Sequence, residues 1–298
     1  MEIIVEVGTA DQQELIKNEI LMFVSSMDSV AFASNLIKII VPEDFDKAVN
    51  LIQNTDDYLS VRGVGKGKFI TGGKIIEIEN GIIMILPPYL YTELYDDVIR
   101  GFIIIHELAH VLSKNIFPRI ITPLFAKNFY FTNLYILYDE YFANRFSYKV
   151  IDNVYPEKSE RWNFFYKSHA EGFLEKLLDQ AYYETLTGYI WQFRTRVIKD
   201  VDSFLEIASH SINELAISTM HLFSALHDVG GILDISALDG SKFINEKTFA
   251  LVEYLRKKYE APDHDLTDGY ELISDYLTIF GIKVEDIPGG GYIHVLDI

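Results

Sequence analysis

Residues 103–112 of this chain read IIIHELAHVL. Two histidines in this stretch, His106 and His110, are separated by three residues, and Glu107 directly follows the first of them. Their neighbours are all uncharged, which is typical of a helix that is buried on every side. Burying two histidines and a glutamate costs free energy unless they are paired or bound to a metal. The stretch therefore predicts a buried helix whose three polar side chains are paired or bound to a metal.

Residues four apart on an α-helix lie on one face, one turn from each other. His106 and His110 can therefore direct one imidazole nitrogen each toward a single ion at about 2.1 Å. Glu107 points beside that ion, so we expect it to act as a general base toward a metal-bound water. The alternative is a chance pattern whose histidines are satisfied by hydrogen bonds in the core. The chain has no cysteine, so any transition metal must be held by histidine and carboxylate.

A hydrolytic zinc site requires three protein ligands and one open position. The best candidate for the third ligand is Glu140 in the segment YDEYFANRFS, residues 138–147, where apolar and aromatic neighbours indicate a mostly buried helix. Asn144 lies one turn later on the same face, where it can hydrogen-bond the other ring nitrogen of a ligating histidine. Asp139 is the alternative ligand, and the plainer interpretation of Glu140 is a solvated helix charge.

The motif HELAH, followed 30 residues after His110 by the pair Glu140 and Asn144, resembles the gluzincin metallopeptidases. Within that group, the segment EYFANRFS is most similar to the E-x-E-A-N-x-F-A segment of the ImmA/IrrE-type metallopeptidases. It departs from that segment at Phe142 and Ser147, which replace a glutamate and an alanine.

The resemblance implies a zinc-dependent metallopeptidase (a hydrolase) that cleaves peptide bonds of a protein or peptide substrate. Zn²⁺ would be held by His106, His110 and Glu140, and Glu107 would activate the zinc-bound water. In such enzymes a sheet precedes the active-site helix, and its edge strand pairs with an extended substrate. By position that strand is residues 82–86, with an ordinary core hairpin as the alternative.

Two other functions stay open. A non-catalytic binding or sensing protein could keep the zinc site in a structural or relict form, although the intact Glu107 argues against this. A latent regulatory peptidase or toxin would act on one specific partner protein.

Gluzincin-type peptidases generally add one residue that stabilises the oxyanion. The candidates in the second half of the chain are His169, His210, His221, His227, Tyr182 and Tyr183.

The first 90 residues alternate between two kinds of pattern. Residues 2–7 and 36–41 are predicted strands, and residues 12–27 and 42–53 have the helical spacing of apolar side chains. Two β-rich runs within residues 74–88 then predict a hairpin whose tight turn is formed by the Asn-Gly dipeptide at positions 80 and 81.

The remaining residues are predicted to be mainly helical. Helical patterns cover 92–113, 133–152 and, in long segments, 159–227, and a loop rich in proline and aromatic residues occupies 116–131. A further helix precedes the C-terminal run IPGGGYIHVLDI.

The fold class expected from these elements is α+β. A zincin-like metallopeptidase core, consisting of a small mixed sheet plus the active-site helix, is followed by a mostly helical C-terminal half. We expect the catalytic core at residues 1–155, with both the HELAH helix and the Glu140 helix. The helical region at residues 156–298 would complete the cleft.

The composition narrows the class of protein. With 49% hydrophobic and 23% charged residues among 298, the chain can bury a large core and is too mixed for disorder. A net charge of -18 would repel a phosphate backbone, so we expect no direct nucleic-acid binding. The first residues do not resemble a signal peptide, and no apolar run reaches the roughly 18 residues of a membrane span. We therefore expect a cytoplasmic protein that does not bind membranes.

Overall fold

The structure is a computed structural model that describes residues 1–27, 35–56, 58, 61–62, 69–70, 72–92, 96–117, 120, 122–156, 159–228, 238, 240–261 and 264–298. The chain forms two compact units. The first comprises Met1–Ile116 with Arg145–Asn163, and the second comprises Phe117–Asn144 with Phe164–Ile298. These units differ from the division expected at residue 155 because one long helix, α6 (Phe125–Val154), contributes to both.

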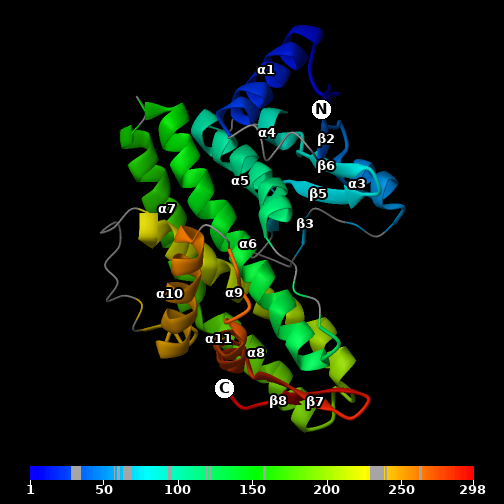
Figure 1. The fold of residues 1–298 in the computed structure, drawn as a ribbon, viewed down its shortest axis with the longest axis vertical. Coiled ribbons are helices and arrows are strands. Elements are labelled where there is room, and N and C mark those ends of the chain that lie inside the picture. The colour runs from blue at the N-terminus through cyan, green and yellow to red at the C-terminus, as the bar shows by residue number, and fades with distance from the viewer. Residues whose placement is uncertain are drawn as a thin grey trace. The chain divides into compact units, whose positions relative to one another are not determined.

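The first unit contains a four-stranded mixed sheet in the order β1-β2-β6-β5 (Figure 1). The pairs β1–β2 and β2–β6 are parallel, and β5–β6 is antiparallel. Its strands are β1 (Glu2–Val5), β2 (Leu36–Val41), β5 (Lys74–Ile78) and β6 (Gly81–Ile85). A separate antiparallel pair is formed by β3 (Val61–Arg62) and β4 (Phe69–Ile70). The small mixed sheet predicted from the sequence is confirmed.

The edge strands of this sheet are β1 and β5, so the prediction that residues 82–86 form an edge strand was wrong. Strand β6 lies between β2 and β5 and pairs with both. Its sequence GIIMI carries only apolar side chains, and residues 82–85 are buried, which suits a central strand. Strand β5 instead carries Lys74 and Glu77, and charged side chains are common on edge strands.

The predicted β5–β6 hairpin is confirmed, but its turn lies one residue earlier than expected. Ile78 pairs with Gly81, so the two turn residues are Glu79 and Asn80. Gly81 has φ +149°, and a Cβ atom at this position would lie 2.6 Å from the backbone oxygen of Asn35. The glycine is therefore required for the close approach to the segment before β2 rather than for the turn itself.

Helices cover the sheet and pack on one another. Helix α3 (Phe45–Gln53) contributes Phe45 and Val49 to a core cluster with Ile76, Ile83 and Ile85 of β5 and β6. This cluster fixes one face of the hairpin, since each of its members is buried.

Helix α5 (Asp97–Ile116) packs against α1 (Ala10–Ser26). The helices approach closely at Gly101, where a Cβ atom would lie 2.9 Å from Cζ of Phe23. Beside this contact Arg100 donates hydrogen bonds of 2.8–3.1 Å to both carboxylate oxygens of Glu19. This packing and a bidentate ion pair together hold α5, the helix that carries HELAH, against α1.

The helix predicted over residues 92–113 begins later than expected. A short helix, α4 (Tyr89–Thr92), precedes it, and α5 itself starts at Asp97. The side chain of Asp96 accepts a hydrogen bond of 2.8 Å from the backbone N–H of Val98, which caps the start of α5.

Helix α6 begins at Phe125, so the loop predicted over residues 116–131 was wrong for its last seven positions. The first turns of α6 are held by residues much later in the chain. Asp286 accepts a hydrogen bond of 2.9 Å from the backbone N–H of Ala126, and the backbone N–H of Val284 donates to the hydroxyl of Tyr130 at 2.7 Å. A local pattern cannot include such partners.

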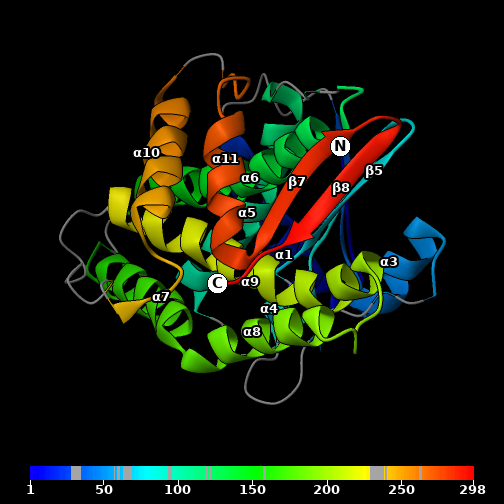
Figure 2. The same ribbon diagram turned by 90° about the horizontal axis from the view of Figure 1, so that it is seen from below.

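The second unit is built mainly from helices (Figure 2). Its C-terminal run folds into an antiparallel hairpin, β7–β8, which the sequence analysis did not predict. Ile287 pairs with Gly290 across a turn of Pro288 and Gly289, and Gly289 has φ +87°, as the third position of a type II turn requires. Besides α6 up to Asn144, this unit contains α7 (Ser159–Leu178) from Phe164 onward. Its other elements are α8 (Gln180–Arg194), α9 (Val201–Asp228), α10 (Glu246–Glu260), α11 (Tyr270–Leu277), the 3₁₀ turn η4 (Thr278–Phe280), β7 (Ile282–Ile287) and β8 (Gly290–Val295).

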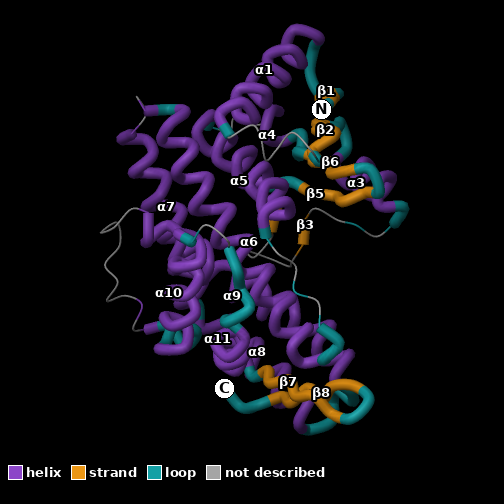
Figure 3. The backbone as a smooth tube through the Cα atoms, viewed as in Figure 1, coloured by secondary structure: helices purple, strands orange, loops and turns teal. Residues whose placement is uncertain are grey.

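The fold class α+β is confirmed, with helix as the dominant secondary structure (Figure 3). None of the helices in the described part of the chain is both long enough and apolar enough to cross a bilayer.

We predict opposite stability changes for alanine at two helical glycines. Gly101→Ala should lower the free energy of unfolding by about 1 kcal/mol or more, because the new methyl group overpacks the contact with Phe23. Gly188→Ala in α8 is the matched control, since a Cβ atom there meets nothing within 4 Å. It should raise stability by about 0.5–1 kcal/mol through helix propensity. Urea unfolding of both variants measures the difference; equal gains would contradict the close approach of α1 and α5.

Candidate metal centre

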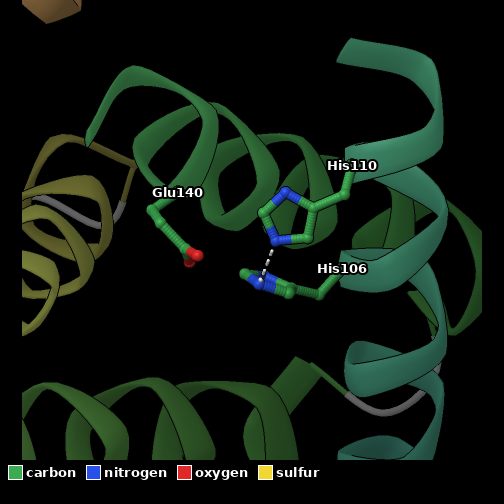
Figure 4. Close-up of side chains that lie close together, drawn as sticks. All are labelled: His106, His110 and Glu140. Atoms are coloured by element: carbon green, nitrogen blue, oxygen red, sulfur yellow. Dashed lines mark hydrogen bonds between the residues drawn. The ribbon is translucent and has the colours of Figure 1, made fainter. Parts of the chain in front are cut away.

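His106 and His110 lie one turn apart on α5, and one ring nitrogen of each is directed at the other (Figure 4). Their Nε2 atoms are 3.0 Å apart, and the ring planes are inclined by 87°. Two imidazoles in this arrangement either share one hydrogen bond or direct both lone pairs at a common cation. Two nitrogens at about 2.0–2.1 Å from a tetrahedral zinc ion are about 3.3 Å apart. The observed spacing is therefore close to that of two ligands of one ion.

Glu140 of α6 completes a group of three metal-ligating side chains. One ligand atom from each of His106, His110 and Glu140 lies within 4.8 Å of the other two, and the carboxylate is directed toward the rings (Figure 4). Two imidazole nitrogens and one carboxylate oxygen are a donor set that zinc accepts. The group can hold a metal ion.

The alternative ligand, Asp139, does not belong to this group among the residues that the structure describes. Consecutive residues of an α-helix point about 100° apart, so Asp139 and Glu140 cannot both face the same histidines. The side chains next to them, Leu137, Tyr138 and Tyr141, are buried, which leaves Glu140 on a largely enclosed helix. Its own side chain is 22% exposed, so the plainer interpretation as a solvated surface charge does not hold.

Glu107 is buried, with 8% of its surface exposed, and its side chain lies against the glycines that lead into β5. A Cβ atom at Gly73 would lie 2.6 Å from Cγ and 2.7 Å from Cδ of Glu107. At Gly72 a Cβ atom would be 3.4 Å from Oε1, which is an ordinary contact. Only a residue without a side chain at position 73 leaves room for the Glu107 carboxyl group in this orientation.

Asn144 is also buried, with 1% of its surface exposed. Among the described residues its Nδ2 atom has no hydrogen-bond partner. The contact expected between Asn144 and a ligating histidine is therefore not made through this atom. A buried amide without a partner costs free energy, so Asn144 is under-satisfied in this arrangement.

One of the six proposed oxyanion-stabilising residues contacts the group directly. Nε2 of His221, on α9, lies 2.9 Å from Oε2 of Glu140. His221 was a candidate for oxyanion stabilisation, but no feature of the sequence connects it with Glu140. The two residues are 81 positions apart, and no local pattern relates them.

Four of the other candidates are engaged elsewhere in the described structure. Tyr182 donates a hydrogen bond of 2.7 Å to Glu214, which also lies 3.5 Å from His210. Burial and this hydrogen bond raise the pKa of the Tyr182 hydroxyl, which therefore stays protonated. Tyr183 donates to the backbone oxygen of Ile298 at 3.0 Å. His227 lies 2.6 Å from the hydroxyl of Tyr141 through Nδ1.

Comparison of the chain with models of protein families, with curated proteins and with solved structures finds no match. The chemistry of the site must therefore be argued from its own side chains.

We predict that the purified protein binds about one zinc ion per chain, since three protein ligands suffice for such a site. His106→Ala, His110→Ala and Glu140→Gln should each weaken zinc binding strongly, because each replaces one ligand. Asp139→Asn is the matched control and should bind zinc as the wild type does. Isothermal titration with zinc, together with elemental analysis, measures both affinity and stoichiometry. Loss of zinc in Asp139→Asn with retention in Glu140→Gln would show that the third ligand is misassigned.

Proposed function

We propose that this protein is a zinc-dependent metallopeptidase of the zincin type. The observation that carries the proposal is the grouping of His106, His110 and Glu140 next to a helix position, Glu107, that suits a general base. A purely structural metal site needs its ligands but has no use for a carboxylate beside them. The gluzincin-like spacing of the same residues supports the same function.

A bound zinc ion would activate a water molecule and polarise the carbonyl group of a peptide bond. Glu107 accepts one proton from the attacking water, whose oxygen forms a bond to the carbonyl carbon. The bond from that carbon to nitrogen then breaks, and Glu107 transfers its proton to the departing amine. Each proton taken up by Glu107 is thus returned, and the carboxylate is ready for the next cycle.

An extended peptide is the substrate that the surroundings of Glu107 favour. Gly73, which touches the Glu107 side chain, directly precedes the edge strand β5. A peptide that adds to the sheet along β5 would use backbone hydrogen bonds, which are independent of its side chains. Its backbone would then run beside the carboxylate of Glu107. The same placement is less suited to a small, compact substrate.

We predict that Glu107→Gln still binds zinc, because the amide preserves the shape of the side chain. Its rate of peptide hydrolysis should fall by about 100-fold or more, because the amide cannot accept a proton. Activity is measured on a mixture of unstructured peptides by mass spectrometry, with zinc content determined on the same samples.

Loss of zinc and of folding in Glu107→Gln would instead assign a structural role to this residue. A third outcome is that wild type and variant both bind zinc but neither cleaves the peptides or denatured proteins. This outcome would favour a non-catalytic protein or a peptidase restricted to one partner.

A second prediction concerns the room that Gly73 leaves for Glu107. Gly73→Ala should reduce hydrolysis by at least about 10-fold, because a Cβ atom 2.6 Å from Cγ forces the base out of position. Zinc affinity should stay unchanged, since no ligand moves. Gly72→Ala is the matched control and should retain most activity. Its Cβ atom would lie closest to Cγ2 of Ile103, at 3.2 Å, and would be 3.4 Å from Oε1 of Glu107. Equal activity of the two variants would contradict the role of Gly73.

A further inference from the structure

The contact between His221 and Glu140 joins helices α9 and α6 within the second unit. Nε2 of His221 lies 2.9 Å from Oε2 of Glu140, and the two side chains are 16% and 22% exposed. Both are therefore largely shielded from water, where a hydrogen bond to a charged group is stronger than at an open surface.

The direction of this hydrogen bond follows from the chemistry of its partners. An ionised carboxylate only accepts hydrogen bonds, so the Nε2 atom of His221 carries the proton and donates it. The ring is held edge-on to Phe173 of α7, with centroids 4.9 Å apart and planes inclined by 73°. The backbone oxygen of His221 accepts a hydrogen bond of 2.8 Å from Ser224. The contact with Phe173 thus constrains the imidazole ring without involving Glu140.

We propose that His221 is a positioning residue that holds Oε2 of Glu140 and presents Oε1 to the metal ion. This inference rests on the proposed function, because it takes Glu140 as the third ligand. A glutamate has three rotatable side-chain bonds, and fixing one oxygen removes most of that freedom before the ion arrives. Carboxylates that bind metals are usually hydrogen-bonded in this way, and such partners affect affinity strongly.

Two neighbouring histidines contact tyrosine hydroxyls on α6. His264 and His227 contact the hydroxyls of Tyr138 and Tyr141, which flank Glu140 on α6, at 2.7 and 2.6 Å. Both partners are phenols rather than ligating groups. His221, in contrast, contacts Glu140, a member of the metal-ligating group.

A positioning role also differs from oxyanion stabilisation, which the sequence analysis considered for His221. Stabilising an oxyanion requires an N–H group aimed at the reacting carbonyl oxygen. With Glu140 ionised, the Nε2 proton of His221 is already donated to its carboxylate. The two roles predict different effects on the metal, because only the positioning role changes the ligand field.

The test compares four variants of the 298-residue chain. His221→Leu removes the donor, His221→Gln places an amide N–H near the position of Nε2, and His221→Asn carries the same amide one carbon short of that position. His210→Leu is the matched control, because His210 also lies on α9 beside a carboxylate, Glu214, at 3.5 Å, and Glu214 does not belong to the ligand group. Zinc affinity is measured by competition with a chelator, and the visible spectrum of the Co²⁺-loaded protein reports the coordination of the metal.

We expect His221→Leu and His221→Asn to weaken zinc binding by about 10-fold to 100-fold and to alter the Co²⁺ spectrum. His221→Gln should keep most of the affinity and the wild-type spectrum, as should His210→Leu. Should His221→Leu fail to fold, the comparison of the glutamine and asparagine variants decides the question, because both keep a polar side chain.

Wild-type affinity and spectrum in the leucine and asparagine variants would overturn the inference and leave the proposed function intact. A loss of hydrolysis in these variants with an unchanged metal would also overturn it, since His221 would then act on the substrate. If the wild-type protein binds neither Zn²⁺ nor Co²⁺, the proposed function fails, and this inference fails with it.

Discussion

The structure depends on a single constraint: α5 carries two histidines and a glutamate through an apolar interior. Ile104, Ile105, Leu108, Ala109 and Val111 on this helix are all buried, so its polar side chains cannot be satisfied by water alone. The spacing of His106 and His110 brings their Nε2 atoms to 3.0 Å, which is favourable only with a shared proton or a cation. The cost of burying these groups is offset by that arrangement.

The two carboxylates of the candidate site are held by opposite means. Glu107 occupies space that exists because Gly73 has no side chain, so its orientation is set by the backbone that leads into β5. Glu140 instead receives a hydrogen bond from His221. A ligand gains from such a donor, because one carboxylate oxygen is then held in place before the ion arrives. The different surroundings thus suit the different roles that we propose for the two residues.

Several elements of the fold were predictable because their patterns are local. The alternation of strands and helices in the first 90 residues, the β5–β6 hairpin and the long helices of the C-terminal half follow from the spacing of apolar residues. The errors arose where distant residues intervene. Helix α6 begins at Phe125 because Asp286 accepts a hydrogen bond from its first turn. Likewise β6 is a central strand because β2 pairs with it, although β5 is its neighbour in sequence.

The sequence by itself determined the local relations among the side chains of the candidate site. Helical periodicity places His106 and His110 on one face and sets Glu107 beside it, and the same periodicity separates Glu140 from Asp139 by about 100°. These relations hold within one helix, so a linear pattern contains them. Only the tertiary structure decided which residues surround these side chains. Gly73 lies against Glu107, and His221 lies against Glu140, across 34 and 81 positions of sequence. Such pairs form because separate elements pack together, and packing depends on the shape of the whole chain rather than on any local spacing.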